Sequence, residues 1–147
     1  MTKFYHGTDI ENLLKIAKSQ AILSPLYQRI EMLRELTKGK SEQEITKRLH
    51  GKTIEQYALE SVSENYGPHE IESRAKAVSF ARELDRALVY AERFEQYSGG
   101  AVLELELSEE DIQSALKKGK TPVLYIPRKQ VSENRLSGIY LLPQARV

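Results

Sequence analysis

Two short segments contain the residues whose types and spacing suit ligand binding or catalysis. The first is Tyr5-His6-Gly7-Thr8, and the second is Val78-Ser79-Phe80-Ala81, followed by Tyr90-Ala91. The chain has no Gly-rich phosphate loop, paired-histidine zinc motif, nucleophile elbow or EF-hand run, so the common nucleotide-binding and hydrolase motifs give no support. Taken alone, each segment also fits a structural role. His6 would then be a satisfied histidine beside a turn, and Phe80 and Tyr90 would be core residues of a strand and helix.

The local pattern places each segment where a strand meets a helix. Residues 3–5 read as a short strand, and Thr8-Asp9-Ile10-Glu11 fits a capping box that starts a helix over residues 9–20. Residues 76–81 read as a second strand. The apolar residues of the helix that follows recur at helical spacing between positions 84 and 94. His6 and Gly7 are therefore expected at a strand end, with Tyr90 on a helix.

The middle third of the chain, at about residues 25–66, is predicted to be a helical insert. Three helix-start signals occur there: Ser24-Pro25, Ser41-Glu42-Gln43-Glu44 and Thr53-Ile54-Glu55-Gln56. Gly39, Gly51 and Gly67 follow the expected helices as stops. We see no internal repeat and no low-complexity stretch.

The remaining pattern predicts an α+β fold in one domain over residues 1–147. Residues 101–107 alternate strictly between apolar and other residues, which indicates a half-buried strand with Glu104 and Glu106 on its solvent side. A short capped helix is expected after Ser108, and further strands at residues 122–126 and 139–142. This order of elements favours a mixed or antiparallel sheet.

Composition and charge constrain function only broadly. Lys and Arg total 22 against 21 Asp and Glu, so the net charge of +1 supplies no global field for a polyanion, although a local basic patch is still compatible with it. The absence of cysteine excludes a thiolate nucleophile and a cysteine-based metal site, and it suits a reducing cytoplasm. No signal segment or apolar run of membrane length is seen, so a cytoplasmic protein is expected.

The two segments together resemble the ADP-ribosyltransferases, in particular the histidine-tyrosine-glutamate branch that includes diphtheria toxin and the poly(ADP-ribose) polymerases. In that branch an aromatic-His-Gly-Ser/Thr strand end precedes a helix, as Tyr5-His6-Gly7-Thr8 does here. A later strand carries an aromatic-Phe-Ala sequence, here Ser79-Phe80-Ala81, and the following helix carries a tyrosine, here Tyr90. The resemblance covers residues 3–20, 76–94 and 131–147. It implies a split β-sheet with an NAD cleft.

The resemblance also implies a role for each matched residue. His6 would hydrogen-bond the ribose attached to adenine, and the Gly7 backbone would pair with the nicotinamide carboxamide, where glycine allows a close approach. Tyr90 would stack on the nicotinamide ring. The other cofactor-binding candidates are Tyr5, Thr8, Ser79, Phe80 and Ala81. No metal is implied.

The family also places a glutamate on a late strand, where it supports the positive charge that develops on the ribose in the transition state. Our candidate is Glu133, because it precedes Gly138-Ile139 and the final apolar residues much as the glutamate does in many small transferases. Glu104 and Glu106 are its competitors. With His6 and Tyr90, Glu133 completes the expected catalytic set.

Two positions depart from the family pattern. Ser79 replaces an aromatic residue that usually backs the nicotinamide pocket, unless Tyr5, Phe80 or Tyr97 substitutes for it. Ala87 stands where polymerase-like members have a serine that binds the carboxamide. The pocket is therefore expected to be looser than usual.

The expected activity is transfer of ADP-ribose from NAD to a protein or nucleic-acid acceptor, or to water as an NAD glycohydrolase. A tRNA 2′-phosphotransferase is a related possibility, but it needs basic residues around a phosphate that the sequence does not identify. The non-enzyme alternative is a degenerate transferase fold whose insert binds a partner protein. The resemblance also associates a small chain of this kind with toxins and phage effectors. The sequence does not indicate the oligomeric state.

Overall fold

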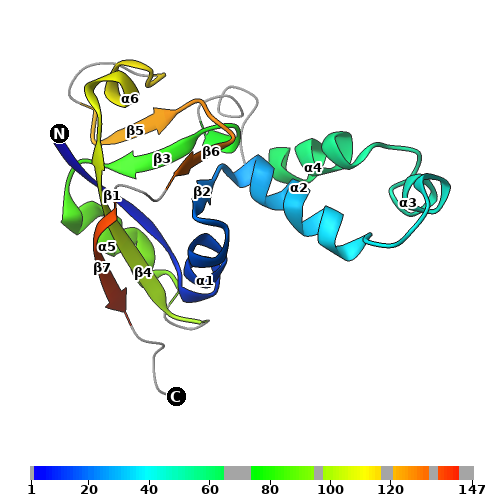
Figure 1. Cartoon of the computed structure of the whole chain (residues 1–147), viewed down its shortest axis with the longest axis horizontal. Helices are drawn as coiled ribbons and strands as arrows, with labels where there is room; N and C mark the ends of the chain where they lie inside the picture. Colours follow the sequence, from blue (N-terminus) through cyan, green and yellow to red (C-terminus); the bar gives the residue numbers. More distant parts are fainter. Residues whose placement is uncertain (1, 65–73, 95–97, 117–120, 133–135, 143–147) are drawn as a thin grey trace.

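The computed structural model describes residues 2–64, 74–94, 98–116, 121–132 and 136–142. The chain is an α+β structure built on a five-stranded antiparallel sheet, with a separate two-stranded sheet beside it (Figure 1). The large sheet has, in spatial order, β5 (Val123–Ile126), β3 (Val78–Ala81), β1 (Thr2–Asp9), β4 (Gly100–Leu107) and β7 (Leu136–Leu142). The small sheet pairs β2 (Ala21–Leu23) with β6 (Gln130–Ser132). The α+β prediction with an antiparallel sheet is confirmed.

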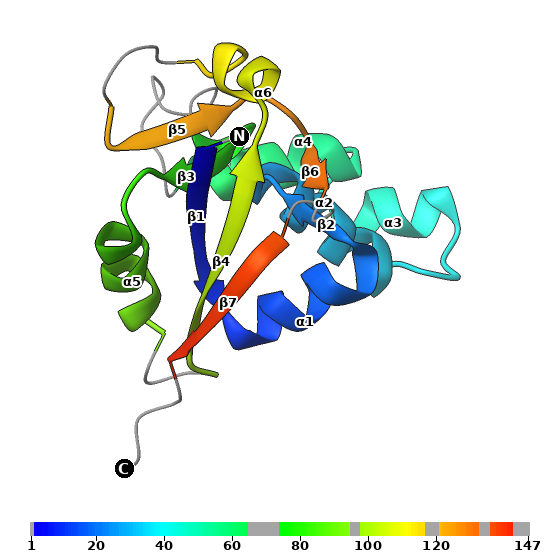
Figure 2. The same ribbon diagram turned by 60° about the vertical axis from the view of Figure 1, so that its left-hand side comes forward.

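Helices α1 (Ile10–Ser19) and α5 (Leu84–Glu92) lie on either side of β1 and β4 (Figure 2). Side chains alternate between the two faces of a strand, so neighbouring residues enter different cores. Phe4 and Leu103 pack with Ile16 of α1 in the larger core, while Tyr5 and Val102 pack in the core beneath α5. The strand β1 is thus covered on both faces.

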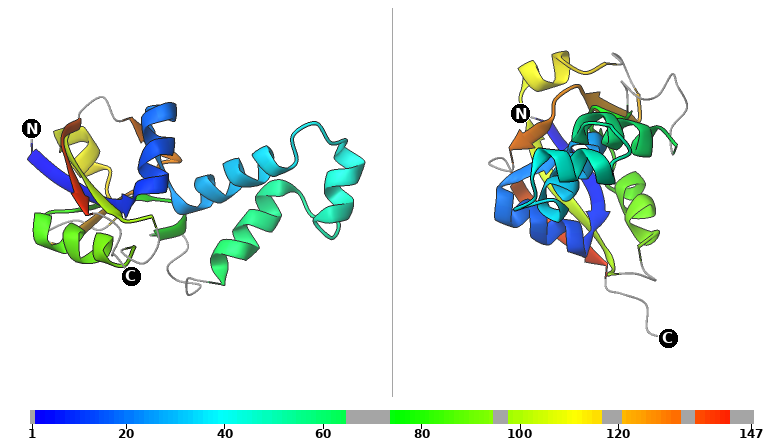
Figure 3. Two further views of the ribbon diagram at one scale, coloured as in Figure 1. Left: turned by 90° about the horizontal axis from the view of Figure 1, so that it is seen from below. Right: turned by 90° about the vertical axis from the view of Figure 1, so that its right-hand side faces the viewer.

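Three helices between β2 and β3 form a projection that we call the helical arm: α2 (Pro25–Leu36), α3 (Glu42–Arg48) and α4 (Ile54–Ser63). The arm extends away from the sheets (Figure 3, left). Its small core contains Ile30 and Leu33 of α2 and Ala58 of α4. Helices are therefore present where the helical insert was predicted.

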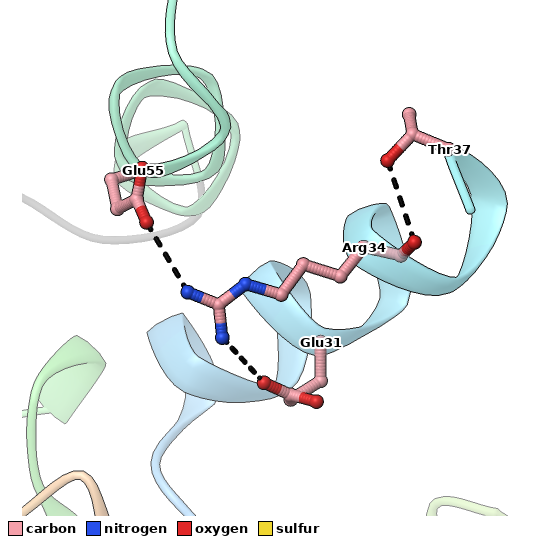
Figure 4. A network of polar contacts seen from close by, with 4 residues as sticks. All are labelled: Glu31, Arg34, Thr37 and Glu55. Atoms are coloured by element: carbon pink, nitrogen blue, oxygen red, sulfur yellow. Dashed lines mark hydrogen bonds and ion pairs between the residues drawn. The ribbon is translucent and has the colours of Figure 1, made fainter. Parts of the chain in front are cut away.

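An arginine joins two helices of the arm on its surface. The Arg34 guanidinium donates to Glu31 at 2.9 Å within α2 and to Glu55 of α4 at 3.3 Å (Figure 4). At the end of α2 the Thr37 hydroxyl donates to the Leu33 carbonyl at 2.7 Å. All three charged groups are largely exposed, so these pairs contribute little to stability.

Helix ends follow the predicted capping chemistry with one exception. Ser24, Ser41 and Thr53 each cap the helix that follows, and Gly39 and Gly51 both have φ of +82° just after a helix. At α1, however, Asp9 is the cap and accepts a hydrogen bond from the Asn12 amide, whereas Thr8 was expected there. The reason is that Thr8 still belongs to β1, which continues to Asp9, four residues beyond the strand end expected at Tyr5. Gly67 lies outside the described residues.

Strands β2 and β6 were not predicted. Each has three residues, too few for an alternating pattern, and they become strands by pairing with each other across more than 100 positions of sequence, with Ile22 opposite Val131. In the part of the chain that the structure describes, no helix is long and apolar enough to span a membrane.

Candidate functional site

The site begins where β1 and β3 separate. The two strands share one bridge, Tyr5 opposite Ala81, although continued antiparallel pairing would bring His6 opposite Phe80. Instead, the His6 side chain reaches across the gap, and its Nδ1 lies 2.7 Å from the Ser79 carbonyl oxygen. A side chain thus replaces the main-chain ladder, and the large sheet opens at this point.

The bond to Ser79 determines the protonation of the His6 ring. A carbonyl oxygen only accepts hydrogen bonds, so Nδ1 must carry the proton and Nε2 of the neutral ring is left as an acceptor. Burial lowers the pKa of His6 below its usual 6.5, against the smaller opposing effect of the Ser79 bond. His6 is therefore neutral at pH 7. Its ring packs 5.8 Å, centroid to centroid, from that of Phe80.

A cavity of about 1260 Å³ lies at this opening, between β1, β3, β5, α1, α5 and the first turn of α2. Seven of the eight residues predicted to bind a cofactor line it: Tyr5, His6, Gly7, Thr8, Ser79, Ala81 and Tyr90. Phe80 does not, because its side chain points to the opposite face of β3 and is fully buried in the larger core. Phe80 touches the site only through the His6 ring.

Gly7 sets the distance between α5 and β1. A Cβ atom at this position would lie 2.9 Å from both the Ala87 carbonyl oxygen and the Tyr90 Cδ1 atom. Close helix packing therefore explains this glycine without any ligand, whereas the sequence suggested either a turn or the close approach of a ligand. The same packing brings Ala87 and Tyr90 directly beside the Gly7 backbone.

Tyr90 is accessible from the cavity. Its side chain is 45% exposed, and its ring meets the Phe94 ring edge-on at 5.7 Å. The Arg93 guanidinium lies 5.3 Å from the Tyr90 ring centroid, within the range of a cation–π contact. The ring is thus supported on α5 while part of its surface stays open.

The two departures from the family pattern differ in their consequences. Ala87 is buried and lines the cavity, where a serine would add a hydroxyl. Ser79 offers its carbonyl to His6, an interaction that any residue type could make. Of the aromatic residues that could compensate, Tyr5 lines the cavity, Phe80 backs His6 from the core, and Tyr97 lies outside the described residues.

Charged residues around the cavity were missed in the sequence. Four basic side chains line it, and three acidic ones oppose them: Lys15, Arg74, Arg86 and Arg93, with Asp9, Glu11 and Asp85. Arg86 and Arg93 are seven residues apart, so they lie on nearly the same face of α5 as Tyr90. That spacing was a signal the sequence already contained. The four basic side chains suit a ligand that carries phosphates, and the three acidic ones keep the cavity wall from being strongly basic.

The three candidate glutamates are placed very differently. Glu133 lies outside the described residues. Glu104 was expected on the solvent side of its strand, and that prediction is wrong, since the residue is only 7% exposed. Its carboxylate accepts hydrogen bonds from Tyr140 at 2.8 Å and Ser137 at 3.0 Å and pairs with Lys3 at 3.2 Å. Glu106 is partly exposed, and neither Glu104 nor Glu106 lines the cavity.

A β-bulge places Ser137 beside Glu104. The register between β4 and β7 shifts next to Glu104, so that Gly138 lies opposite Glu104 and Leu136 opposite Leu105. The extra residue, Ser137, then donates both to the Glu104 carbonyl and to its carboxylate. Glu104 thus ties β1, β4 and β7 together, which is a structural role.

The Glu104 cluster predicts an acid-sensitive contribution to stability. Hydrogen bonds from Tyr140 and Ser137, together with Lys3, hold the pKa of the Glu104 carboxyl below its usual 4.5. A carboxyl with a lowered pKa stabilises the fold above its unfolded value, and this contribution disappears as pH falls through the folded value. We expect Glu104→Gln to lower the melting temperature at pH 7. Below about pH 5, the melting temperature of the variant should fall less with decreasing pH than that of the wild type. Glu106→Gln is the matched control; equal pH profiles for Glu104→Gln and wild type in thermal melts would refute the assignment.

The comparisons with known proteins add no relative. No protein-family model, curated protein or solved structure matches the chain. Within the described ranges, no three histidine, aspartate or glutamate side chains are grouped as metal ligands. The geometry of the cavity is therefore the ground on which a function is proposed.

Proposed function

We propose that this chain binds NAD in the cavity at the β1/β3 opening and transfers its ADP-ribose to a macromolecule or to water. The observation that carries the proposal is that His6, Gly7 and Tyr90 line one cavity, although Tyr90 is more than 80 residues from the other two in sequence. This is the combination that the resemblance to the ADP-ribosyltransferases requires. We also propose the split sheet of that family, supported by the single bridge between β1 and β3 and by the separate β2/β6 pair.

Each residue has a chemical role in this proposal. Nε2 of neutral His6 accepts a hydrogen bond from a hydroxyl of the adenine ribose, and the Gly7 backbone pairs with the nicotinamide carboxamide. The Tyr90 ring stacks on the nicotinamide, a contact of about 1 kcal/mol beyond its buried area. Pro25 and Gln28, at the base of the helical arm, also line the cavity, so the arm stands next to the path of an acceptor.

The reaction breaks the bond between the nicotinamide nitrogen and the ribose carbon. Nicotinamide leaves as a neutral ring with the bonding electrons, and the positive charge passes to the ribose as an oxocarbenium ion. The carboxylate of Glu133 stabilises that charge, which is largest in the transition state. An oxygen or nitrogen of the acceptor then bonds to the ribose carbon and gives up a proton, and with water the product is free ADP-ribose.

The first test is an NAD titration of the purified chain followed by thermal shift, together with an assay of nicotinamide release. NAD should raise the melting temperature, because a ligand that binds only the folded state stabilises it. Release without an added acceptor indicates hydrolysis. If release needs a lysate, digestion of the labelled product with nuclease or protease identifies the acceptor class. The proposal is rejected if NAD causes no thermal shift and no nicotinamide is released.

A His6→Ala variant should bind NAD about tenfold more weakly than wild type. One neutral hydrogen bond contributes about 0.5–1.5 kcal/mol, and 1.4 kcal/mol corresponds to a tenfold change. Calorimetric titration at pH 7 measures the affinity, and His50→Ala is a suitable control because His50 is exposed on the helical arm. Unchanged affinity in His6→Ala, with its fold intact by circular dichroism, would remove His6 from the site.

A second activity is favoured by the basic side chains around the cavity. A tRNA 2′-phosphotransferase needs cations near a phosphate, and Lys15, Arg74, Arg86 and Arg93 line the same cavity as His6. An RNA oligonucleotide with an internal 2′-phosphate tests this alternative. Loss of its 2′-phosphate only when NAD is present would assign that activity. An NAD-induced thermal shift without either reaction would instead favour the degenerate, partner-binding fold.

A further inference from the structure

The last strand of the large sheet has an exposed apolar edge. β7 is the terminal strand in the sheet order, and among the described residues no strand pairs with its outer side. Its sequence, Leu-Ser-Gly-Ile-Tyr-Leu-Leu, contains no charged residue and no proline. Charged residues and proline commonly protect edge strands, because the free N–H and C=O groups of an edge attract other strands.

Three consecutive large side chains of β7 are also exposed. Ile139 is 49% exposed, Tyr140 39% and Leu141 63%, and no other three consecutive large hydrophobic residues of the described chain are exposed together. Ile139 and Leu141 share one face of the sheet, since they pair with Leu103 and Ala101 of β4. Tyr140 is on the other face, where its hydroxyl is held by Glu104.

The opposite edge of the same sheet is protected differently. Leu124 and Ile126 of β5 are buried, and the Tyr125 carbonyl accepts a hydrogen bond from the Leu116 amide at 3.0 Å. The chain thus covers part of its own β5 edge with the segment after α6 (Glu109–Gln113). Among the described residues, the outer edge of β7 has no such cover.

We propose that β7 pairs antiparallel with β7 of a second copy of this chain, which joins the two large sheets into one. A partner for this edge must offer an unpaired strand with apolar side chains two residues apart, and β7 itself meets both requirements. Because the strand is uncharged, self-pairing places no like charges opposite each other. Antiparallel self-pairing also has two-fold symmetry, the commonest arrangement of protein dimers.

The residue pattern selects one register for this pairing. With the two-fold axis at Tyr140, Ile139 of one copy lies opposite Leu141 of the other, and the same pair occurs again on the other side of the axis. With the axis at Ile139, Ile139 would lie opposite its own copy and Leu136 opposite Leu142, but each Leu141 would lie opposite Ser137. The Tyr140-centred register therefore gives both exposed aliphatic side chains, Ile139 and Leu141, an apolar partner.

Sedimentation equilibrium of the full chain tests the dimer. The wild type should have twice its chain mass of 16.8 kDa, and the double variant Ile139→Lys/Leu141→Lys should have the chain mass at the same concentration. Leu36→Lys is the matched control, because Leu36 is 66% exposed but lies on the helical arm, and it should remain dimeric. A monomeric wild type, a dimeric double variant or an open-ended series of larger assemblies would overturn the proposal.

Disulfide trapping tests the register without charged substitutions. The chain has no cysteine, so single-cysteine variants give unambiguous products. In a mixture of Ile139→Cys and Leu141→Cys, the cross-link between unlike chains should exceed those between like chains, since residues directly opposite in antiparallel strands are within disulfide range. The Leu36→Cys variant gives the yield of cross-linked product that random collision between chains produces. Equal amounts of like and unlike cross-links, or a yield no higher than that of Leu36→Cys, would contradict the register and the β7 interface.

Discussion

We expect the Glu133→Gln variant to release nicotinamide from NAD at least about 100-fold more slowly than wild type, with little change in NAD affinity. Removing a group that stabilises charge only in the transition state typically costs a factor of about 100 to 1,000 in rate. Glutamine keeps the size and the hydrogen-bonding oxygen but loses the negative charge. The loss should therefore appear in kcat and leave KM nearly unchanged.

The other two glutamates are the controls for this variant. The Glu104 carboxylate is engaged by Lys3, Ser137 and Tyr140, and Glu106 does not line the cavity. Glu106→Gln should retain the wild-type rate, and Glu104→Gln should retain it below its melting temperature. A slow Glu104→Gln enzyme beside a normal Glu133→Gln enzyme, both folded, would reverse the assignment.

A Gly100→Ala variant should be destabilised by about 3 kcal/mol or more, the upper range for overpacking a closed site. An ideal Cβ atom at Gly100 would lie 2.1 Å from the Ala91 carbonyl oxygen and 2.7 Å from the Ala91 carbonyl carbon. Both atoms belong to the backbone of α5, so the clash cannot be relieved by turning a side chain. The helix must move away from β4 and take Tyr90 with it.

Chemical denaturation and thermal melts measure this loss, which should amount to roughly 10 °C in melting temperature at about 2–4 °C per kcal/mol. Gly138→Ala is the matched control on the same sheet. Its added Cβ would meet the Glu104 side chain at an ordinary 3.6 Å, so it should cost far less. Equal melting temperatures for the two variants would show that α5 is not packed against Gly100 as described.

The sequence by itself determined the features that depend on neighbouring residues. Ser24-Pro25, Ser41 and Thr53 begin their helices as predicted, because a capping side chain bonds to an amide only three residues away. The alternation in residues 101–107 was enough to identify β4, and the glycines after α2 and α3 were enough to end those helices. These interactions involve residues within one helical turn or one strand, so they can be predicted from the sequence without knowledge of the fold.

The tertiary structure alone decided what happens between distant segments. β2 and β6 are strands because they pair with each other, and Glu104 is surrounded by Lys3, Ser137 and Tyr140 from the neighbouring strands. Phe80 is removed from the predicted site by the face of β3 on which it lies. The cavity lies where the main-chain pairing of β1 and β3 stops and His6 bonds instead to Ser79. Local patterns identify which residues can do chemistry, but long-range strand pairing decides which of them come together, because it fixes both the register and the face of each side chain.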